Sequence, residues 1–213
     1  MHVSIPYGDS INQELMICEE ASLYGHDSIE CTGEDLMNQL DCLLFSLQID
    51  GVVDGSYPKR DMVTVLNYTP KLLNDIGLPN LPIVITQKHI YTIINNDGKY
   101  KNVNYHGLGI DIIKQIPGCI KKPLYVLKSR TRDDSILIIT KLRDNYSRPV
   151  VASIRINGKG QIKNIQFKSN VMTSVYGRNN YNKFLMDNVM LGNLLYDHNI
   201  GIIKKLDTTN RKQ

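Results

Sequence analysis

Residues 135–176 carry the pattern that decides the fold, and they read SILIITKLRDNYSRPVVASIRINGKGQIKNIQFKSNVMTSVY. Within this stretch, short runs rich in β-branched residues recur at 135–141, 150–156, 162–168 and 170–176. Polar residues, glycine and proline separate most of the runs, and Asn157-Gly158 is typical of a two-residue hairpin turn. The pattern predicts successive antiparallel strands.

Two short helices are predicted before this stretch. Thr86 is suited to cap the first helix, because isoleucines follow it at helical spacing. The second helix is predicted from about residue 110 to 116, where Pro117-Gly118 stops it. Helices that precede an antiparallel sheet in this way predict an α+β fold, with the helices packed on the sheet.

Further elements are predicted on both sides of the central stretch. Short strands are predicted at 124–127 and 193–196. A helix is predicted over residues 180–191, with its apolar side formed by Phe184, Leu185 and Val189.

Charge divides the chain near residue 80. Residues 1–80 contain three Lys or Arg and thirteen Asp or Glu, so their net charge is 3 − 13 = −10. The remainder carries 25 − 3 = 22 basic and 21 − 13 = 8 acidic residues, or +14. A division of this size suggests a nucleic-acid or membrane partner for the basic part. The acidic part could lie over the basic surface and shield it, or the two could be independent.

Three parts are therefore expected along the chain. Residues 1–80 form an acidic, partly helical segment with a regulatory or docking role, residues 81–200 form the basic domain, and residues 201–213 form a polar tail. Leucines at helical spacing predict an amphipathic helix over residues 33–48. Residues 68–82 contain three prolines and one glycine, which predicts a linker.

Several classes of site are absent from the sequence. No apolar run approaches the roughly 18 residues that a membrane span needs. The four cysteines lack metal-type spacing, which indicates reduced thiols in a cytosolic chain. Because no metal cluster, P-loop or GxGxxG motif occurs, we expect no metal and no cofactor.

A polar run ends the central stretch and could bind phosphate. Strand alternation places Ser174, Tyr176 and Arg178 on one face, and Thr173 and Val175 on the other. A hydroxyl, a phenol and a guanidinium on one face can together hold a phosphate. An exposed strand face that ends in a turn would show the same pattern.

Two histidines complete a set of groups that can cleave RNA. His89 falls in the first turn of the helix that Thr86 caps, beside Lys88, where the helix dipole favours a neutral imidazole. His106 precedes Gly107 in a loop. Each could equally be a surface or turn histidine. Cleavage of RNA by its own 2′-OH needs a base, an acid and cations but no metal, and this set supplies them.

These residues lie in segments that resemble a known family. The segments are LPIVITQKHI (81–90), HGL (106–108), KPLYVLKS (122–129), DSILIIT (134–140), RPVVASIRING (148–158), SNVMTSVYGR (169–178) and GNLLY (192–196). In this order they resemble the C-terminal domain of phage MuF-type polyvalent proteins. That domain is a phage branch of the barnase–EndoU–colicin–RelE-like (BECR) nuclease superfamily.

The resemblance implies a BECR-like α+β fold and a metal-independent endoribonuclease, used as a toxin or effector in phage or inter-bacterial conflict. It implies His89, His106, Ser174 and Tyr176 as catalytic residues, with Lys88, Thr173 and Arg178 as substrate-binding residues. His89 would be the general base on the 2′-OH and His106 the general acid, or the reverse, and the product would carry a 2′,3′-cyclic phosphate.

The expected partners are RNA, with tRNA as one candidate, and an immunity or antitoxin protein, in the bacterial cytosol and away from the membrane. The sequence does not fix the oligomeric state. The alternative is a catalytically inactive nuclease-like module, encoded by a phage, that inhibits a host factor by binding it.

Overall fold

The computed structural model describes residues 32–94 and 107–206. Contacts divide the chain after Leu36, and residues 37–213 form one compact unit. His106 falls outside the described residues. No described helix combines the length and apolarity needed to cross a lipid bilayer.

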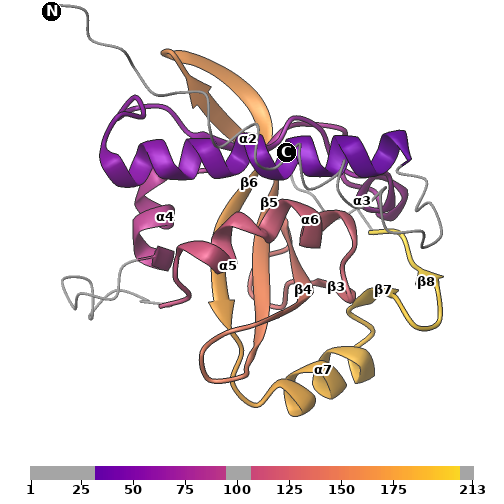
Figure 1. Cartoon of the computed structure of the whole chain (residues 1–213). Coiled ribbons are helices and arrows are strands. Elements are labelled where there is room, and N and C mark those ends of the chain that lie inside the picture. Colours follow the sequence, from indigo (N-terminus) through magenta and orange to yellow (C-terminus); the bar gives the residue numbers. More distant parts are fainter. Residues whose placement is uncertain (1–31, 95–106, 207–213) are drawn as a thin grey trace, which may run out of the picture. The chain divides into compact units, whose positions relative to one another are not determined.

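One mixed sheet of eight strands organises the unit (Figure 1). Its order is β1-β2-β6-β5-β4-β3-β7-β8, and all neighbours are antiparallel except β2 and β6. The bounds are β1 (Val63–Leu66), β2 (Ile83–Ile85), β3 (Tyr125–Lys128), β4 (Ser135–Arg143), β5 (Pro149–Ile162), β6 (Ile165–Gly177), β7 (Leu194–Asp197) and β8 (Ile202–Ile203). The predicted α+β class is confirmed.

Helices cover both faces of the sheet. The bounds are α2 (Gly33–Asp54), α3 (Lys71–Ile76), α4 (Gln87–Ile94), α5 (Ile110–Lys114), α6 (Ile116–Lys121) and α7 (Tyr181–Met190). The main core joins α2 through α6 to one face, whereas Phe184 and Leu185 of α7 pack on the other. The side chains on the second face form a smaller hydrophobic cluster. Ile138 packs in the main core and the adjacent Ile139 in the smaller cluster, because successive side chains of a strand point to opposite faces of the sheet. Figure 1 shows α7 at the end of the strands away from α2.

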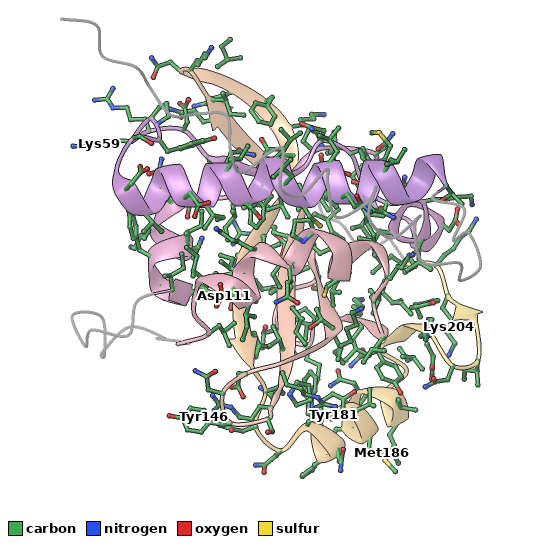
Figure 2. All side chains as sticks on the ribbon, viewed as in Figure 1. Lys59, Asp111, Tyr146, Tyr181, Met186 and Lys204 are labelled. Carbon is green, nitrogen blue, oxygen red and sulfur yellow. The ribbon has the colours of Figure 1, made fainter. Side chains whose placement is uncertain are left out.

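Two predicted helices form where expected, with one error in the packing of the second. The backbone N–H of His89 donates to Thr86 Oγ1 at 3.2 Å, so Thr86 caps α4 as predicted. Helix α7 also forms, but Val189 is exposed rather than packed with Phe184 and Leu185. Figure 2 labels Tyr181 and Met186 on α7.

The prediction that Pro117-Gly118 stops a helix is wrong. Helix α6 begins at Ile116 and runs through both residues. Proline is tolerated in the first turn of a helix, where its missing N–H leaves no internal bond unmade. Pro117 therefore lies at the start of a second helix and not beyond the end of the first.

The hairpin turn predicted at Asn157-Gly158 is also wrong. Both residues lie within β5, and the register shifts there as at a β-bulge. The pair Ile162↔Ile165 instead closes a two-residue turn at Lys163-Asn164, where both residues have positive φ. The two runs predicted at 162–168 and 170–176 consequently merge into the single strand β6.

The segment predicted as a linker, residues 68–82, is part of the fold. Leu73 and Ile76 of α3 are fully buried in the main core, and β1 pairs with β2 across the predicted boundary. The Asn170 side chain donates to Thr69 Oγ1 at 2.9 Å and to the Pro79 carbonyl at 3.1 Å. Pro70 and Pro82 directly precede α3 and β2 within one compact unit, whereas the contacts divide the chain after Leu36.

Helix α2 forms, but its leucines do not make the core. Phe45, Ile49 and Val52 are buried, whereas Leu40 and Leu47 are exposed. Periodicity identified the helix, yet both of its sides are apolar and the pattern cannot say which one is covered. The acidic residues of α2 do meet the basic part, because Asp41 pairs with Lys121 and Asp50 with Lys114. Neither lysine lies in the cleft described below.

Candidate functional site

A cleft of about 650 Å³ opens on the face of the sheet that carries α7. Its lining comes from β4, β5 and β6, from α4 and α7, and from the loop between β3 and β4. Four arginines line it, and no carboxylate does: Arg130, Arg132, Arg155 and Arg178. The cleft is therefore suited to an anionic ligand.

Parallel pairing of β2 with β6 brings His89 to this cleft. Ile85, the last residue of β2, is the partner of Met172 on β6. Thr86 follows Ile85 directly in sequence, as Thr173 follows Met172. Helix α4 begins directly after Thr86, and His89 lies in its first turn. The pairing of β2 with β6 thus brings His89 and Thr173, which are more than 80 positions apart in sequence, to the same cleft.

A β-bulge brings two consecutive polar residues, Thr173 and Ser174, to the cleft. Ser153 pairs with Ser174, but the next pair is Ile154 with Met172, which leaves Thr173 without a cross-strand partner in the register. Thr173 lines the cleft together with Ser174, contrary to the prediction that the two face opposite sides. Simple alternation fails at this point because it assumes an unbroken ladder.

His89 is a half-buried histidine with a fixed ring. Its Nδ1 lies 2.8 Å from Thr86 Oγ1, so Nε2 is the ring nitrogen that this contact leaves available. Burial lowers the pKa of His89, and the positive charges of Lys88 and Arg155 lower it further. The ring is therefore neutral at pH 7. When Nδ1–H donates to Thr86, Nε2 carries the lone pair of a base.

Two arginines of the cleft have buried donors without a hydrogen-bond partner in residues 32–94 and 107–206. The Arg178 guanidinium stacks on the Phe184 ring, with 4.1 Å between Cζ and the ring centroid. The Nε atoms of Arg155 and Arg178 are buried, and neither has a hydrogen-bond partner among the described residues. Arg155 Nε lies 3.6 Å from Asp134 Oδ2, which counts as an ion pair but is too long for a hydrogen bond. Buried donors of this kind are expected where a ligand completes the site.

Hydroxyl groups of β5 and β6 also line the cleft. Thr173 Oγ1 lies 3.3 Å from Ser153 Oγ, and Ser153 and Ser174 are cross-strand partners. Burial raises the pKa of Tyr176, although the charge of Arg178 acts in the opposite direction. Tyr176 therefore keeps its proton at neutral pH and is a hydrogen-bond donor or an acid.

Five of the seven predicted site residues line the cleft: His89, Thr173, Ser174, Tyr176 and Arg178. Lys88 is not among the lining residues, and His106 lies outside the described residues. Sequence reasoning missed Arg130, Arg132, Arg155 and Ser153. Ser153 and Arg155 stand two residues apart on β5, and only the register shows that their face meets Ser174 and Tyr176.

No group of three or more His, Cys, Asp or Glu side chains in residues 32–94 and 107–206 is arranged to hold a metal ion. The lining of the cleft consists of cationic, hydroxyl, amide, imidazole and apolar side chains. This arrangement can bind phosphate oxygens and transfer a proton.

Gly177, between Tyr176 and Arg178, lies against a buried ion pair. A Cβ atom there would overlap the Asp144 carboxylate and approach Arg148 Nε to 3.1 Å. Burial alone would raise the pKa of Asp144, but hydrogen bonds from Arg148 and Tyr146 outweigh it and lower the pKa. The Asp144–Arg148 pair, at 2.5 Å, is therefore a fixed obstacle.

We expect Gly177→Ala to lower the free energy of unfolding by about 1–3 kcal/mol through overpacking. Thermal unfolding followed by circular dichroism measures this loss. Gly118→Ala is the matched control, because its Cβ would meet only Cys42 Sγ, at an ordinary 3.6 Å. Equal melting temperatures of Gly177→Ala and wild type would show that Asp144 and Arg148 can shift to make room for the added methyl group.

Residues 97–200 match the family model of the phage MuF-C-terminal domain. The match confirms the resemblance seen in the sequence and relates the chain to phage proteins. It contains β3 through β7 and α7, whereas His89 and α4 precede it. Membership of the wider BECR nuclease superfamily stays a prediction. No curated protein and no solved structure matches the chain.

Proposed function

We propose that the protein is a metal-independent endoribonuclease. The observation that carries the proposal is the shared cleft, in which a neutral histidine lies with four arginines, a phenol and a row of hydroxyls. Cleavage through the 2′-OH needs a base and a cationic surface around the phosphate. The cleft contains both, and four arginine side chains line it.

His89 acts as the general base in this proposal. Its Nε2 removes the proton of the 2′-OH, whose oxygen attacks the adjacent phosphorus. Thr86 holds the ring through Nδ1 and so fixes the position of Nε2. The lowered pKa keeps the base unprotonated at neutral pH.

The arginines stabilise the phosphorane that forms. Stacking on Phe184 fixes the plane of the Arg178 guanidinium, which favours a bidentate contact with two phosphate oxygens. Ser174 and Thr173 donate hydrogen bonds to the same group. These contacts strengthen as negative charge develops, which lowers the barrier.

The leaving 5′-oxygen needs a proton as its bond to phosphorus breaks. His106 is the acid that the sequence predicts. Within the described cleft, Tyr176 is a second group with a proton to give, because burial raises its pKa. The products are a 2′,3′-cyclic phosphate and a 5′-hydroxyl end.

The charge of the two longest strands supports a polyanionic substrate. Between Asp144 and Asp187 the sequence contains seven Lys or Arg and no Asp or Glu. This stretch includes β5, β6 and most of α7. An RNA strand bound at the cleft therefore meets little electrostatic repulsion along the neighbouring strands.

Incubation of the purified full chain with total bacterial RNA in EDTA tests the proposal. Wild type is expected to produce discrete fragments, and His89→Ala is expected to leave the RNA intact. RNA binding by wild type without any cleavage would instead support the non-catalytic alternative, in which the module inhibits a host factor.

The pH dependence of the rate reports on His89. Because the base must be neutral, kcat/KM is expected to rise with pH, with the midpoint of the rise below the ordinary histidine pKa of about 6.5. Lys88→Gln removes a positive charge that lowers this pKa, so the acidic limb should move to higher pH. An acidic limb that stays in place in this variant would assign it to another group.

We further propose that the activity serves as a phage-associated toxin or effector in the bacterial cytosol. The similarity to a phage domain supports this role. Induced expression in bacteria should then arrest growth, and His89→Ala should grow normally. A co-expressed immunity protein is the partner to search for among proteins that restore growth.

A further inference from the structure

We propose that the exposed apolar side of α2 joins two copies of the chain as a two-fold dimer. This side, called here the leucine face, consists of Met37, Leu40, Leu43, Leu44 and Leu47. Each of these side chains is between 43% and 57% exposed. Their separations of three, four and seven residues place them together along the helix.

Helix α2 is apolar on two sides, and only one has a cover among the described residues. Phe45, Ile49 and Val52 hold the inner side in the main core. An apolar stripe along a helix normally faces an element that covers it. Monomeric proteins rarely expose contiguous apolar patches larger than a few hundred Å². The leucine face therefore has the character of an interface.

The charges of α2 favour a second copy as the occupant. From Met37 to Val53 the helix has two charged residues, Asp41 and Asp50. Asp41 pairs with Lys121 and Asp50 with Lys114, both within the same chain. In a two-fold interface the same patch meets itself, so a charge close to the two-fold axis would lie near its own copy. The neutral leucine face avoids this repulsion.

The spacing and surroundings of the leucine face also fit a helix partner. Leu40, Leu43 and Leu47 follow the alternating three- and four-residue steps of a coiled-coil seam. Leu44 and Leu47 border a groove of about 330 Å³ whose other wall includes Leu66 of β1. Side chains of a second α2 can enter this groove.

An extended segment that pairs with the edge of β1 is a less suitable occupant than a second α2. The Gln48 side chain accepts from the Thr64 N–H at 3.0 Å and donates to the Thr64 carbonyl at 3.2 Å. It thus occupies the outer edge of β1, where a new strand would bind. A membrane surface is also unsuited, because amphipathic membrane helices carry Lys or Arg beside the apolar face and α2 has neither.

Light scattering coupled to gel filtration on the full chain tests the dimer, at concentrations from about 1 to 100 µM. Wild type should have twice the chain mass of 24.2 kDa. Leu43→Glu/Leu47→Glu should be monomeric, with an unchanged circular dichroism spectrum because both positions face solvent in one copy. The milder Leu40→Gln/Leu47→Gln should raise the dissociation constant at least tenfold.

Met186→Glu/Met190→Glu is the matched control. These methionines are exposed on α7, away from the leucine face, so the variant should remain a dimer. Met186 is labelled at the outer side of α7 in Figure 2. A monomeric wild type over the whole range, or a dimer that persists in Leu43→Glu/Leu47→Glu, would overturn the proposal.

Discussion

Replacing His89 by alanine is expected to lower the rate of RNA cleavage by about 10²–10⁴-fold, the usual contribution of a general base. The loss should appear in kcat, because His89 removes a proton during the reaction and contributes little to binding. Single-turnover cleavage of a labelled RNA measures this rate constant directly. Binding of the same RNA, followed by fluorescence anisotropy, should change by less than about tenfold.

His198→Ala is the matched control for this experiment. His198 is exposed after β7 and lies outside the cleft. Its replacement should leave both cleavage and binding unchanged. If the two histidine variants cleaved RNA equally fast, His89 would have no part in the chemistry and the proposed mechanism would fail.

Replacing Arg178 by lysine is expected to lower kcat by about 10²-fold, although the charge is kept. A lysine cannot form the planar bidentate contact, and its ammonium does not stack on Phe184 as a guanidinium does. The acidic limb of the pH profile should stay in place, because Arg178 is not among the groups that shift the pKa of His89. If Arg178→Lys weakened RNA binding in a salt-dependent way but left kcat unchanged, Arg178 would contribute only general electrostatic attraction.

Arg143→Lys provides the comparison for Arg178→Lys. Arg143 is an exposed arginine at the end of β4 and does not line the cleft. Cleavage by this variant should equal that of wild type. A similar decline in both variants would show that the total positive charge matters, and not the position of one guanidinium.

The strands of the fold could be predicted from the sequence because their side chains alternate or are continuously apolar. Residues 135–141 and 150–156 are examples, and both lie within observed strands. The residue types that favour hairpin turns were a less reliable guide to where the strands end. Asn157-Gly158 has the residues of a hairpin turn, but the actual turn is at Lys163-Asn164. Pairing of whole strands decided between the two positions, and local preference did not.

The covered side of α2 could not be predicted either. The leucine spacing is regular, yet Phe45, Ile49 and Val52 make the core. Both sides of the helix satisfy the same periodicity, so only tertiary packing separates them. The same limit explains the false linker at residues 68–82, where Thr69 and Asn170 join segments distant in sequence.

Five site residues could be found from sequence because they occupy two short polar segments, around His89 and from Thr173 to Arg178. Arg155 could not be singled out from the sequence, because it is the one charged residue in the apolar run 150–156. Its place in the cleft follows from the register, which sets Arg155 opposite Ser135 and near Asp134. Residues brought together by strand pairing rather than by a motif leave no local signal.

The chemical ends of the cleaved RNA test the central claim most directly. Fragments produced by the wild-type chain in EDTA would be analysed by mass spectrometry. Attack by the 2′-OH predicts a 2′,3′-cyclic phosphate on one fragment and a 5′-hydroxyl on the next, with both absent from the His89→Ala reaction. Fragments that end in a 3′-hydroxyl, or RNA that stays intact at every protein concentration, would contradict the account.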